Sequence, residues 1–575
     1  MISILSDNII SPLGFTTRDN YLALKSGKTA LCHHDDLFGL LEPVCASLFG
    51  ESQRKELQTE GLTFFESLAV ASIKEALKET SFDISSQRVA LILASTKGNI
   101  QELEHGGVRV NLAESAQVIA QRVGVTTMPV VACNACISGV TAQVLALRLI
   151  EAGDYDYVIV NGTDCLSKFV VSGFSCLKAL SPEPCRPFDM DRTGLNLGEA
   201  SATMVLGRAD GEHADNTWNI IRGAVRNDAC HISNPSKTAE GCSHAISALS
   251  CDASELSLVS VHGTATLYND QMEAVALQRN NLPDVSTLSL KGYFGHTMGA
   301  AGILETIVSL CCLEDGKTLP SKGFGELGVS AKVNISASPM EIKGHTLLKM
   351  ISGFGGCNAA LLLSKVKGKL GIRNEELTLN SKFKIQNSSH EVRLTCDNVI
   401  LDGQVVPTEN RGRDMLTELY RKHVGDYPRY YKMDILSKVA FICSELLLAA
   451  EGKREGHEED RSVILFNHSS SIVSDKVFLN TITEGYYPSP SVFVYTLPNI
   501  AAGEIAIRNG YHGETSFYIL PQKADDIISM IVEASFGDMG TQSAICGWIN
   551  CDDEKIFEAE MEIVVKEGSE KAFNR

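Results

Sequence analysis

Short apolar runs rich in β-branched residues alternate along this chain with segments of helical periodicity, and this alternation constrains the fold more than any other feature. The run Arg88–Ser95 (RVALILAS) follows the amphipathic segment Phe64–Leu77, and Thr141–Glu151 has the pattern of a further helix. Other buried strands are predicted at Val130–Cys133, Tyr157–Asn161, Ala202–Leu206 and Leu258–Val261. Apolar strands of this kind are buried on both faces, so the pattern predicts an α/β protein with mixed or parallel sheets covered by helices.

The composition excludes a disordered or low-complexity protein, because 44% of the 575 residues are hydrophobic and 21% are charged. The length suggests about three to five domain-sized units. The net charge of −19 disfavours a chain-wide attraction to nucleic acid or to an anionic membrane. The sequence starts without a cationic, apolar leader, and no apolar run reaches the roughly 18 residues that a membrane span requires. The 17 cysteines lack the spacing of a disulfide framework. We therefore expect a soluble cytoplasmic protein with free thiols.

A basic, glycine-containing stretch from about residue 364 indicates a domain boundary, with a linker at 367–390. Beyond it the chain repeats its own start, so we predict an incomplete second copy at 391–575. The matched segments, in order, are Ser6–Ile10 with Cys396–Ile400, Phe64–Leu77 with Met433–Leu448, Val89–Ser95 with Val463–His468, and Val118–Gly124 with Glu504–Gly510. The alternative is that any two α/β segments resemble each other, but the preserved order favours duplication.

Cys136 is the first candidate for chemistry. It follows the predicted strand Val130–Cys133 and precedes a helix, so it lies on a strand-to-helix turn. The free N–H groups and dipole of a helix N-terminus stabilise a thiolate, which would make Cys136 a nucleophile near neutral pH. Two alternatives stay open: a small buried hydrophobe, or one half of a C-x-x-C pair with Cys133 for redox or metal chemistry.

Two histidines lie in glycine-flanked turns. His262 begins the motif HGTAT directly after an apolar strand, and His296 follows Gly295 in GHTMGAAG. Glycine lets the backbone approach a substrate, and imidazole serves as acid, base or hydrogen-bond donor near neutral pH. A single buried histidine is usually structural, whereas two in such turns beside a reactive cysteine indicate a site.

Together these motifs resemble those of the β-ketoacyl synthases of the thiolase fold, over roughly residues 1–366. In this resemblance Cys136 is the acyl-accepting nucleophile, and His262 and His296 are the family's histidine pair. Lys291 corresponds to the lysine of the family's active site. Further matching motifs are Arg186–Asp189 (RPFD), Gly198–Ala200 (GEA) and Gly353–Asn358 (GFGGCN). Ala265 and Ala200 stand where glycine is usual, and both changes are small enough to leave the catalytic roles in place.

The resemblance implies a layered αβαβα fold of two similar halves, to which the second copy adds an incomplete α/β half-repeat. It implies an acyltransferase that performs decarboxylative Claisen condensation between an acyl group on Cys136 and malonyl-ACP, in fatty-acid or polyketide synthesis. The pattern is also similar to ketosynthases of bacterial aryl-polyene pathways. Two neutral imidazoles would stabilise the enolate left by loss of CO₂.

Further roles follow from the same resemblance. The backbone N–H groups of Cys136 and Phe354 would form the oxyanion hole, with Phe354 gating the acyl pocket. Thr264 and Thr266 would bind the phosphopantetheine arm. Lys291 would pair with Glu273 to set the electrostatics of the site, with an ordinary buried salt bridge as the alternative.

No metal and no nucleotide cofactor is expected, because the chain has no phosphate-binding glycine motif. The expected partners are acyl carrier protein and either a second copy of this chain or a ketosynthase-type second subunit. Carrier proteins are acidic, as this chain is, so docking requires a local basic patch. A candidate patch comprises Lys365, Lys367, Lys369 and Arg373, although a solvated linker is the favoured explanation of this stretch.

The second copy lacks the nucleophile and both histidines. An ungapped offset of 386 residues sets Gln522 opposite Cys136, and glutamine at that position resembles the chain-length-factor subunits of some ketosynthases. The alternative is an inert appended domain. In either case we expect it to dock on residues 1–366 or on a second chain, since an isolated half would expose apolar surface. For the whole protein, the rival functions are a thiolase-like coenzyme A acyltransferase and a non-catalytic chain-length or scaffold subunit.

Overall fold

The computed structural model describes residues 2–40, 42–107, 109–208, 217–365, 385–452, 460–482 and 488–567. We call residues 2–365 the first unit and residues 385–567 the second unit. Most of the predicted linker at 367–390, with Lys367, Lys369 and Arg373, lies outside the described residues. None of the helices in the described ranges is both long and apolar enough to cross a membrane.

The first unit contains two five-stranded sheets with the same strand order. The first sheet runs β5-β4-β6-β8-β1, in which the first three strands are parallel and the last two pairs antiparallel. Its strands are β1 (Ile2–Ile10), β4 (Val89–Ala94), β5 (Val130–Ala132), β6 (Tyr157–Asp164) and β8 (Ala200–Gly207). The second sheet runs β11-β10-β12-β13-β9 with the same directions. Its strands are β9 (Asn219–Asn227), β10 (Leu258–Ser260), β11 (Thr287–Leu288), β12 (Thr346–Gly353) and β13 (Cys357–Ser364).

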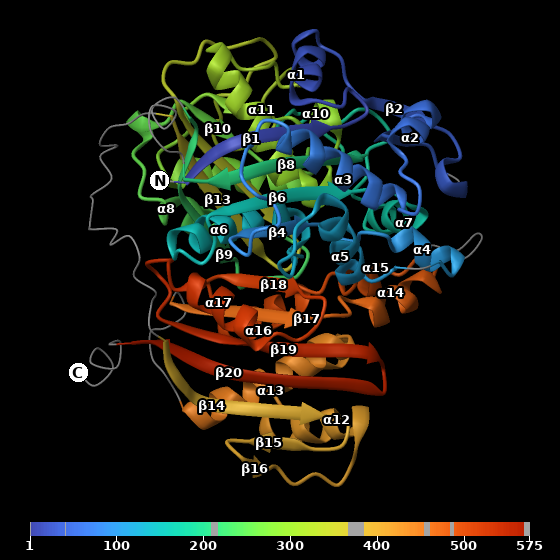
Figure 1. Ribbon diagram of the computed structural model, residues 1–575, viewed down its shortest axis with the longest axis vertical. Coiled ribbons are helices and arrows are strands. Elements are labelled where there is room, and N and C mark those ends of the chain that lie inside the picture. The colour runs from blue at the N-terminus through green and yellow to red at the C-terminus, as the bar shows by residue number, and fades with distance from the viewer. Residues whose placement is uncertain are drawn as a thin grey trace.

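Two helices pack against each other between these sheets, α6 (Ser138–Glu151) and α11 (Ala301–Asp315). Their approach is close: a Cβ on Gly139 would lie 2.7 Å from the Gly299 carbonyl oxygen just before α11, and a Cβ on Gly302 would lie 2.7 Å from the Val140 nitrogen. Glycine is therefore required at this crossing. On the outer faces lie α3 (Phe64–Leu77) and α5 (Leu112–Val123) on the first sheet, and α8 (Glu240–Ser247) and α9 (Leu267–Arg279) on the second. The layers follow the predicted αβαβα order, so that fold class is confirmed (Figure 1).

The second unit repeats the first sheet once. Its strands run β18-β17-β19-β20-β14 with the same directions as β5-β4-β6-β8-β1. They are β14 (Ile385–Thr395), β17 (Arg461–Asn467), β18 (Thr515–Ile519), β19 (Ser543–Asp553) and β20 (Ile556–Lys566). The matching helices are α13 (Ile435–Glu451), α16 (Ile500–Asn509) and α17 (Asp525–Ser535). The predicted half-repeat is thus present. Helix α13 begins two residues later than predicted because Asp434, with extended backbone, accepts a hydrogen bond from the Ser437 N–H and caps it.

The remaining elements are shorter or peripheral. They are α1 (Thr17–Lys25), β2 (Leu31–His34), β3 (Val44–Ser47), α2 (Glu51–Leu57), α4 (Ile100–His105), α7 (Lys168–Cys176), β7 (Leu197–Gly198), α10 (Lys291–Phe294), β15 (Val399–Leu401), β16 (Gln404–Val405), α12 (Gly412–His423), α14 (Ile472–Leu479) and α15 (Pro490–Val494).

The two units form one continuous sheet, because β18 pairs antiparallel with the edge strand β5 (Figure 1). Helix α17 packs on α6 across the same boundary. Buried ion pairs also cross it: Lys97 with Asp475 at 2.6 Å, Arg148 with Glu514 at 2.7 Å, and Arg226 with Asp538 at 2.7 Å. Removing one partner of a buried pair costs about 3–5 kcal/mol, so these contacts specify one docking geometry. The second unit therefore docks on the first unit of its own chain.

Candidate active site

Cys136 lies on the turn between β5 and α6, as the sequence predicts. A short 3₁₀ turn, Ala135–Ile137, carries it, and the preceding Ala135 has φ of 47°. A non-glycine residue in this left-handed region is strained by about 1–2 kcal/mol, a cost typical of functional turns. The second unit helps to fix this turn, because the backbone N–H of Phe517 donates a hydrogen bond to the side-chain oxygen of Asn134 at 2.7 Å.

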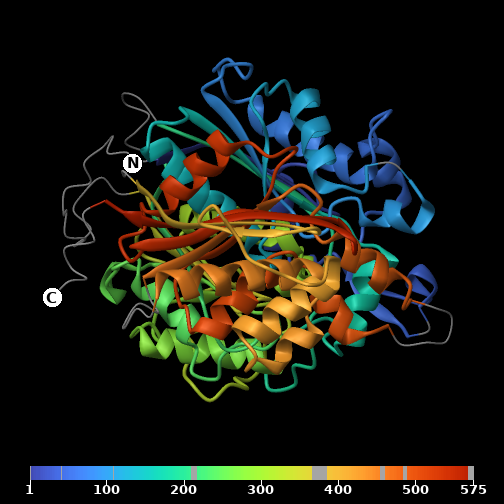
Figure 2. The ribbon, with the colours of Figure 1, turned by 90° about the horizontal axis from the view of Figure 1, so that it is seen from below.

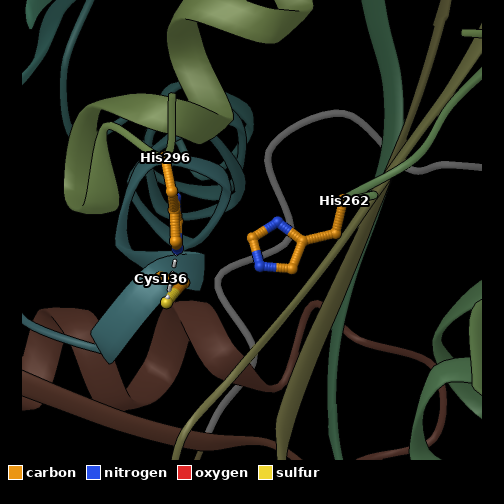
Figure 3. Close-up of side chains that lie close together, drawn as sticks. All are labelled: Cys136, His262 and His296. Carbon is orange, nitrogen blue, oxygen red and sulfur yellow. Dashed lines mark hydrogen bonds between the residues drawn. The ribbon is translucent and has the colours of Figure 1, made fainter. Parts of the chain in front are cut away.

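The structure brings the three predicted catalytic side chains together (Figure 3). His296 Nε2 lies 3.0 Å from Cys136 Sγ. The rings of His262 and His296 meet edge to face with centroids 4.9 Å apart. One ligand atom from each residue lies within 4.8 Å of the others, so this cluster could also hold a soft divalent ion.

Burial dominates the electrostatics of these groups. It raises the pKa of the Cys136 thiol to about 12, although the Lys291 ammonium lowers it in part. The expectation of a thiolate near neutral pH is therefore wrong for the resting site, because desolvation outweighs stabilisation by the helix terminus. Burial, followed by the charge of Lys291, holds the pKa of both His262 and His296 well below the usual value. Both imidazoles are neutral.

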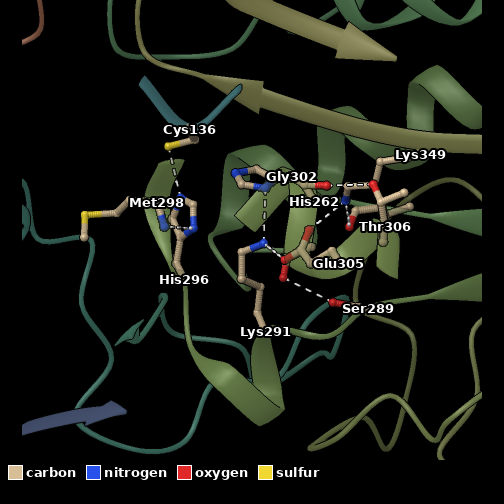
Figure 4. A network of polar contacts seen from close by, with 12 residues as sticks. Cys136, His262, Ser289, Lys291, His296, Met298, Gly302, Glu305, Thr306 and Lys349 are labelled. Atoms are coloured by element: carbon tan, nitrogen blue, oxygen red, sulfur yellow. Dashed lines mark hydrogen bonds and ion pairs between the residues drawn. The ribbon is translucent and has the colours of Figure 1, made fainter. Parts of the chain in front are cut away.

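Lys291 does not pair with Glu273. Its ammonium forms an ion pair with Glu305 on α11 and lies 3.3 Å from His262 Nδ1 (Figure 4). The Glu273 carboxylate instead accepts the backbone N–H groups of His262 and Gly263, at 2.6 and 2.7 Å. Glu273 thus holds the histidine turn, and the predicted pair is wrong.

The sequence analysis missed a second lysine in this network. Lys349 on β12 is fully buried, and its ammonium contacts the second oxygen of Glu305 at 2.6 Å and the Val261 carbonyl at 3.2 Å. Burial lowers the pKa of Lys349, against the opposing effect of Glu305. The available signals were a lysine inside the apolar run of β12 and a glutamate inside the apolar helix α11.

Two cavities meet at Cys136. The larger, of about 320 Å³, opens past His262 and His296 and is lined by Thr264 and Thr266. The smaller, of about 20 Å³, has room for roughly one water molecule and is mainly apolar. Cys136, Phe174 and Phe354 line both cavities, so Phe354 lies where the two cavities meet, and its role as a gate stays a prediction.

The second unit contributes to the smaller cavity. Phe493, Thr496 and Leu497 line it opposite residues of the first unit. The Phe493 ring packs against Phe174 with centroids 5.7 Å apart. A Cβ on Gly173 would meet this ring at 2.0 Å, so the glycine makes room for it. The sequence analysis missed these three residues, since no local motif marks them.

Gln522 lies far from this chemistry. Asp164 and Asn550 hold the same place in the two copies, each accepting two successive backbone N–H groups from the end of the neighbouring strand. Asp164 and Asn550 are 386 residues apart, which is the same offset that sets Gln522 opposite Cys136 in the sequence. However, Gln522 is exposed and lines neither cavity. The second unit has no second half to cover that turn.

The remaining predictions concern thiols and lysines. All 17 cysteines are free, so Cys133 and Cys136 form no disulfide, and buried Cys133 directs its Sγ to the Thr96 carbonyl at 3.6 Å. Lys365 forms an ion pair with Glu314 at 2.6 Å, so it is already engaged within the first unit.

Two family models match the first unit. The one described as "Beta-ketoacyl synthase, N-terminal domain" covers residues 46–211, and the one described as "Beta-ketoacyl synthase, C-terminal domain" covers residues 219–324. The first unit belongs to the β-ketoacyl synthase family. It is an enzyme of the acyltransferase, condensing type, as the sequence predicts.

Relatives of this ketosynthase include 3-oxoacyl-[acyl-carrier-protein] synthase 2 of Coxiella burnetii. It is 26% identical over 402 residues, which are 62% of this chain and 97% of the relative. The ketoacyl synthase alpha subunit of the tetracenomycin polyketide synthase of Streptomyces glaucescens is 28% identical over 346 residues, 52% of this chain and 80% of the relative.

Solved structures share the fold. The ishigamide ketosynthase/chain length factor covers 64% of this chain and 99% of its own, at 23% identity and a TM-score of 0.56. A structure titled "PfaC Keto synthase-Chain length factor" covers 98% of this chain and 78% of its own, at 14% identity and a TM-score of 0.72. The arrangement of both units together therefore has a counterpart among solved structures.

Proposed function

We propose that this ketosynthase transfers an acyl group from a carrier thioester to Cys136 and condenses it with malonyl-ACP, with loss of CO₂. One observation carries the proposal. Two neutral imidazoles, each with its tautomer fixed, face the nucleophile at the junction of an apolar cavity and a wider channel.

The tautomers follow from the hydrogen-bond donors at the far side of each ring. The Met298 backbone N–H donates to His296 Nδ1 at 3.3 Å, and the Lys291 ammonium donates to His262 Nδ1 at 3.3 Å. A neutral ring whose Nδ1 accepts must carry its proton on Nε2. Both histidines therefore present an Nε2–H donor to the site, the requirement for stabilising an enolate oxygen.

Cys136 Sγ attacks the carbonyl of the acyl thioester, and the thiol proton leaves with the carrier sulfur. Malonyl-ACP then loses CO₂, and the electron pair moves to an enolate oxygen held by the Nε2–H groups of His262 and His296. The enolate carbon attacks the acyl carbonyl and expels Cys136 as a thiolate, giving the β-ketoacyl product, and the thiolate takes up a proton from water to restore the resting thiol. No proton needs to leave either imidazole during decarboxylation.

The substrates are proposed to enter by the larger cavity. Thr264 and Thr266, whose hydroxyls lie 2.9 Å apart, supply donors and acceptors for a phosphopantetheine arm. The acyl chain would lie in the smaller cavity and end on Phe493. The small volume of this cavity favours a short acyl group. The second unit would set the length of that group in the manner of a chain length factor. The carrier protein is the proposed partner, and a cytoplasmic location remains a prediction.

A thiolase-like enzyme would need a second thiol as base. Cys357 follows Phe354 closely in the sequence, but its Sγ points to the Phe354 carbonyl at 3.1 Å. Cys357 lines neither cavity. This observation favours condensation over thiolase chemistry.

The proposal is tested by mass spectrometry after incubation with a short acyl-ACP. The added mass should map to Cys136 and disappear in Cys136→Ala, while Cys133→Ala, its buried neighbour, should remain acylated. Malonyl-ACP should then yield CO₂ and a β-ketoacyl product. Acylation at another cysteine, or acylation without CO₂ release, would overturn the proposal.

A further inference from the structure

The turn that carries Phe354 is held by the second unit. Asn499, directly before α16, donates from Nδ2 to the Phe354 carbonyl at 2.8 Å and lies 3.7 Å from Cys357 Sγ. It is 3% exposed. Because a carbonyl can only accept, the amide nitrogen must face it, which fixes the orientation of the side chain.

The side chain of Asn499 does not cap its own helix, because the backbone of Asn499 is already helical. Asparagine at a helix N-cap normally accepts a backbone N–H of the first turn. In the first unit Asn111, which directly precedes the matching helix α5 with extended backbone, does so by accepting the Ala113 N–H at 3.0 Å. Asn499 makes no such bond to α16, and its Oδ1 is buried without a hydrogen-bond partner among the described residues. A buried acceptor without a partner is unfavourable, so the side chain is held where its Nδ2 reaches the Phe354 carbonyl despite this cost.

The fit between α16 and this turn leaves no slack. A Cβ on Gly355 would lie 2.7 Å from Asn499 Nδ2, and a Cβ on Gly503 would lie 2.7 Å from the Gly355 carbonyl oxygen. On the other side, a Cβ on Gly353 would lie 3.2 Å from the Cys136 backbone nitrogen. The turn is therefore clamped between α16 and the nucleophile, so a shift in Asn499 is transmitted to the ring of Phe354.

We propose that Asn499 is a positioning residue that keeps the Phe354 ring between the two cavities and thereby limits access to Cys136. The second unit then acts directly on the gate of the first unit, besides closing the acyl cavity. The functional importance of this role rests on the proposed function. Access to Cys136 can nevertheless be measured without any carrier substrate.

The test measures alkylation of Cys136 by iodoacetamide, read by mass spectrometry, in full-length protein. Asn499→Ala removes the donor, and Asn499→Asp keeps the shape but offers the Phe354 carbonyl no N–H. A single hydrogen bond is worth about 0.5–1.5 kcal/mol net, which corresponds to roughly 2- to 12-fold. We expect both variants to be alkylated at least about threefold faster than the native protein, and Asn111→Ala, the matched control, to be unchanged.

A mere capping role predicts a different pattern. It would make Asn499→Asp as stable as the native protein, since aspartate is a good N-cap, and would leave alkylation unchanged in both variants. Unchanged alkylation overturns the inference. If the native protein accepts no acyl group from a carrier while the variants still alkylate faster, the proposed function fails and the positioning role stands.

Discussion

Phe493 is the residue through which the second unit limits the smaller cavity, the proposed acyl site. Its ring is buried, lies 5.1 Å from the Phe478 ring by centroids and closes the cavity opposite Cys136. Replacing it by alanine opens the space of a phenyl group. If about three more methylenes of an acyl chain are then buried at about 0.8 kcal/mol each, kcat/KM for the longer chain rises by about 50-fold relative to acetyl.

The assay compares acetyl-ACP with acyl-ACPs lengthened stepwise, by rates of Cys136 acylation and by product mass. Phe493→Ala is expected to cost about 3–5 kcal/mol of stability, so Phe493→Leu serves as a milder variant with a smaller shift in the same direction. Phe478→Leu perturbs the same aromatic cluster without lining the cavity and should leave chain preference unchanged. Gln522→Ala should also leave it unchanged, because that side chain is exposed. An unaltered preference in both Phe493 variants would refute the reasoning.

The remaining predictions concern the polar groups of the site. His262→Ala and His296→Ala should each keep acylation but slow CO₂ release from malonyl-ACP by about 10²–10³, and the double variant should be much less than multiplicatively worse, because both act on one transition state. Alkylation of Cys136 should rise about tenfold per unit between pH 7 and 9, since burial raises its pKa to about 12; a plateau below pH 8.5 would contradict this. Glu305→Gln leaves two buried ammonium groups without their carboxylate and should lower stability by about 3–5 kcal/mol in thermal unfolding. Adding Lys349→Met should recover part of that loss.

The local features of this protein could be predicted from its sequence, because the residues that encode them are neighbours along the chain. The strand before Cys136 and the helix after it set the nucleophile on a turn. The glycines beside His262 and His296 likewise mark their turns. The structure has these local features where the sequence predicts them, because strands and glycine-rich turns are formed by short segments of the chain.

Properties set by packing could not be predicted in this way. Several acidic residues lie near Lys291 along the chain, and only the tertiary packing that brings Lys291 to α11 selects Glu305 over Glu273. The thiol pKa depends on how completely the site is desolvated, which the motif around Cys136 does not encode. Phe493 has no motif at all, because its role comes from docking against Gly173 in the other unit.

The sheet of the second unit differs from that of the first in how its two faces are covered. In the first unit, β8 is buried at every position, because helices cover both faces of its sheet. Strand β20 holds the same place in the second unit, yet its residues alternate: Phe557 and Met561 are buried on the side of α13. On the opposite face, Glu560 pairs with Lys523 at 2.6 Å.

This alternation is the pattern of a sheet with one solvated face. Figure 2 shows the orange helices of the second unit gathered on one side of its sheet. The apolar surface expected of an isolated half is therefore absent over β20, where charged residues replace it. What the second unit does bury is the edge strand β18, helix α17 and the start of α16, all against the first unit. The second unit thus keeps its contacts with the turns of Cys136 and Phe354 and is polar where a second half would pack. This combination supports the proposed role of the second unit at the active site over that of an inert appended domain.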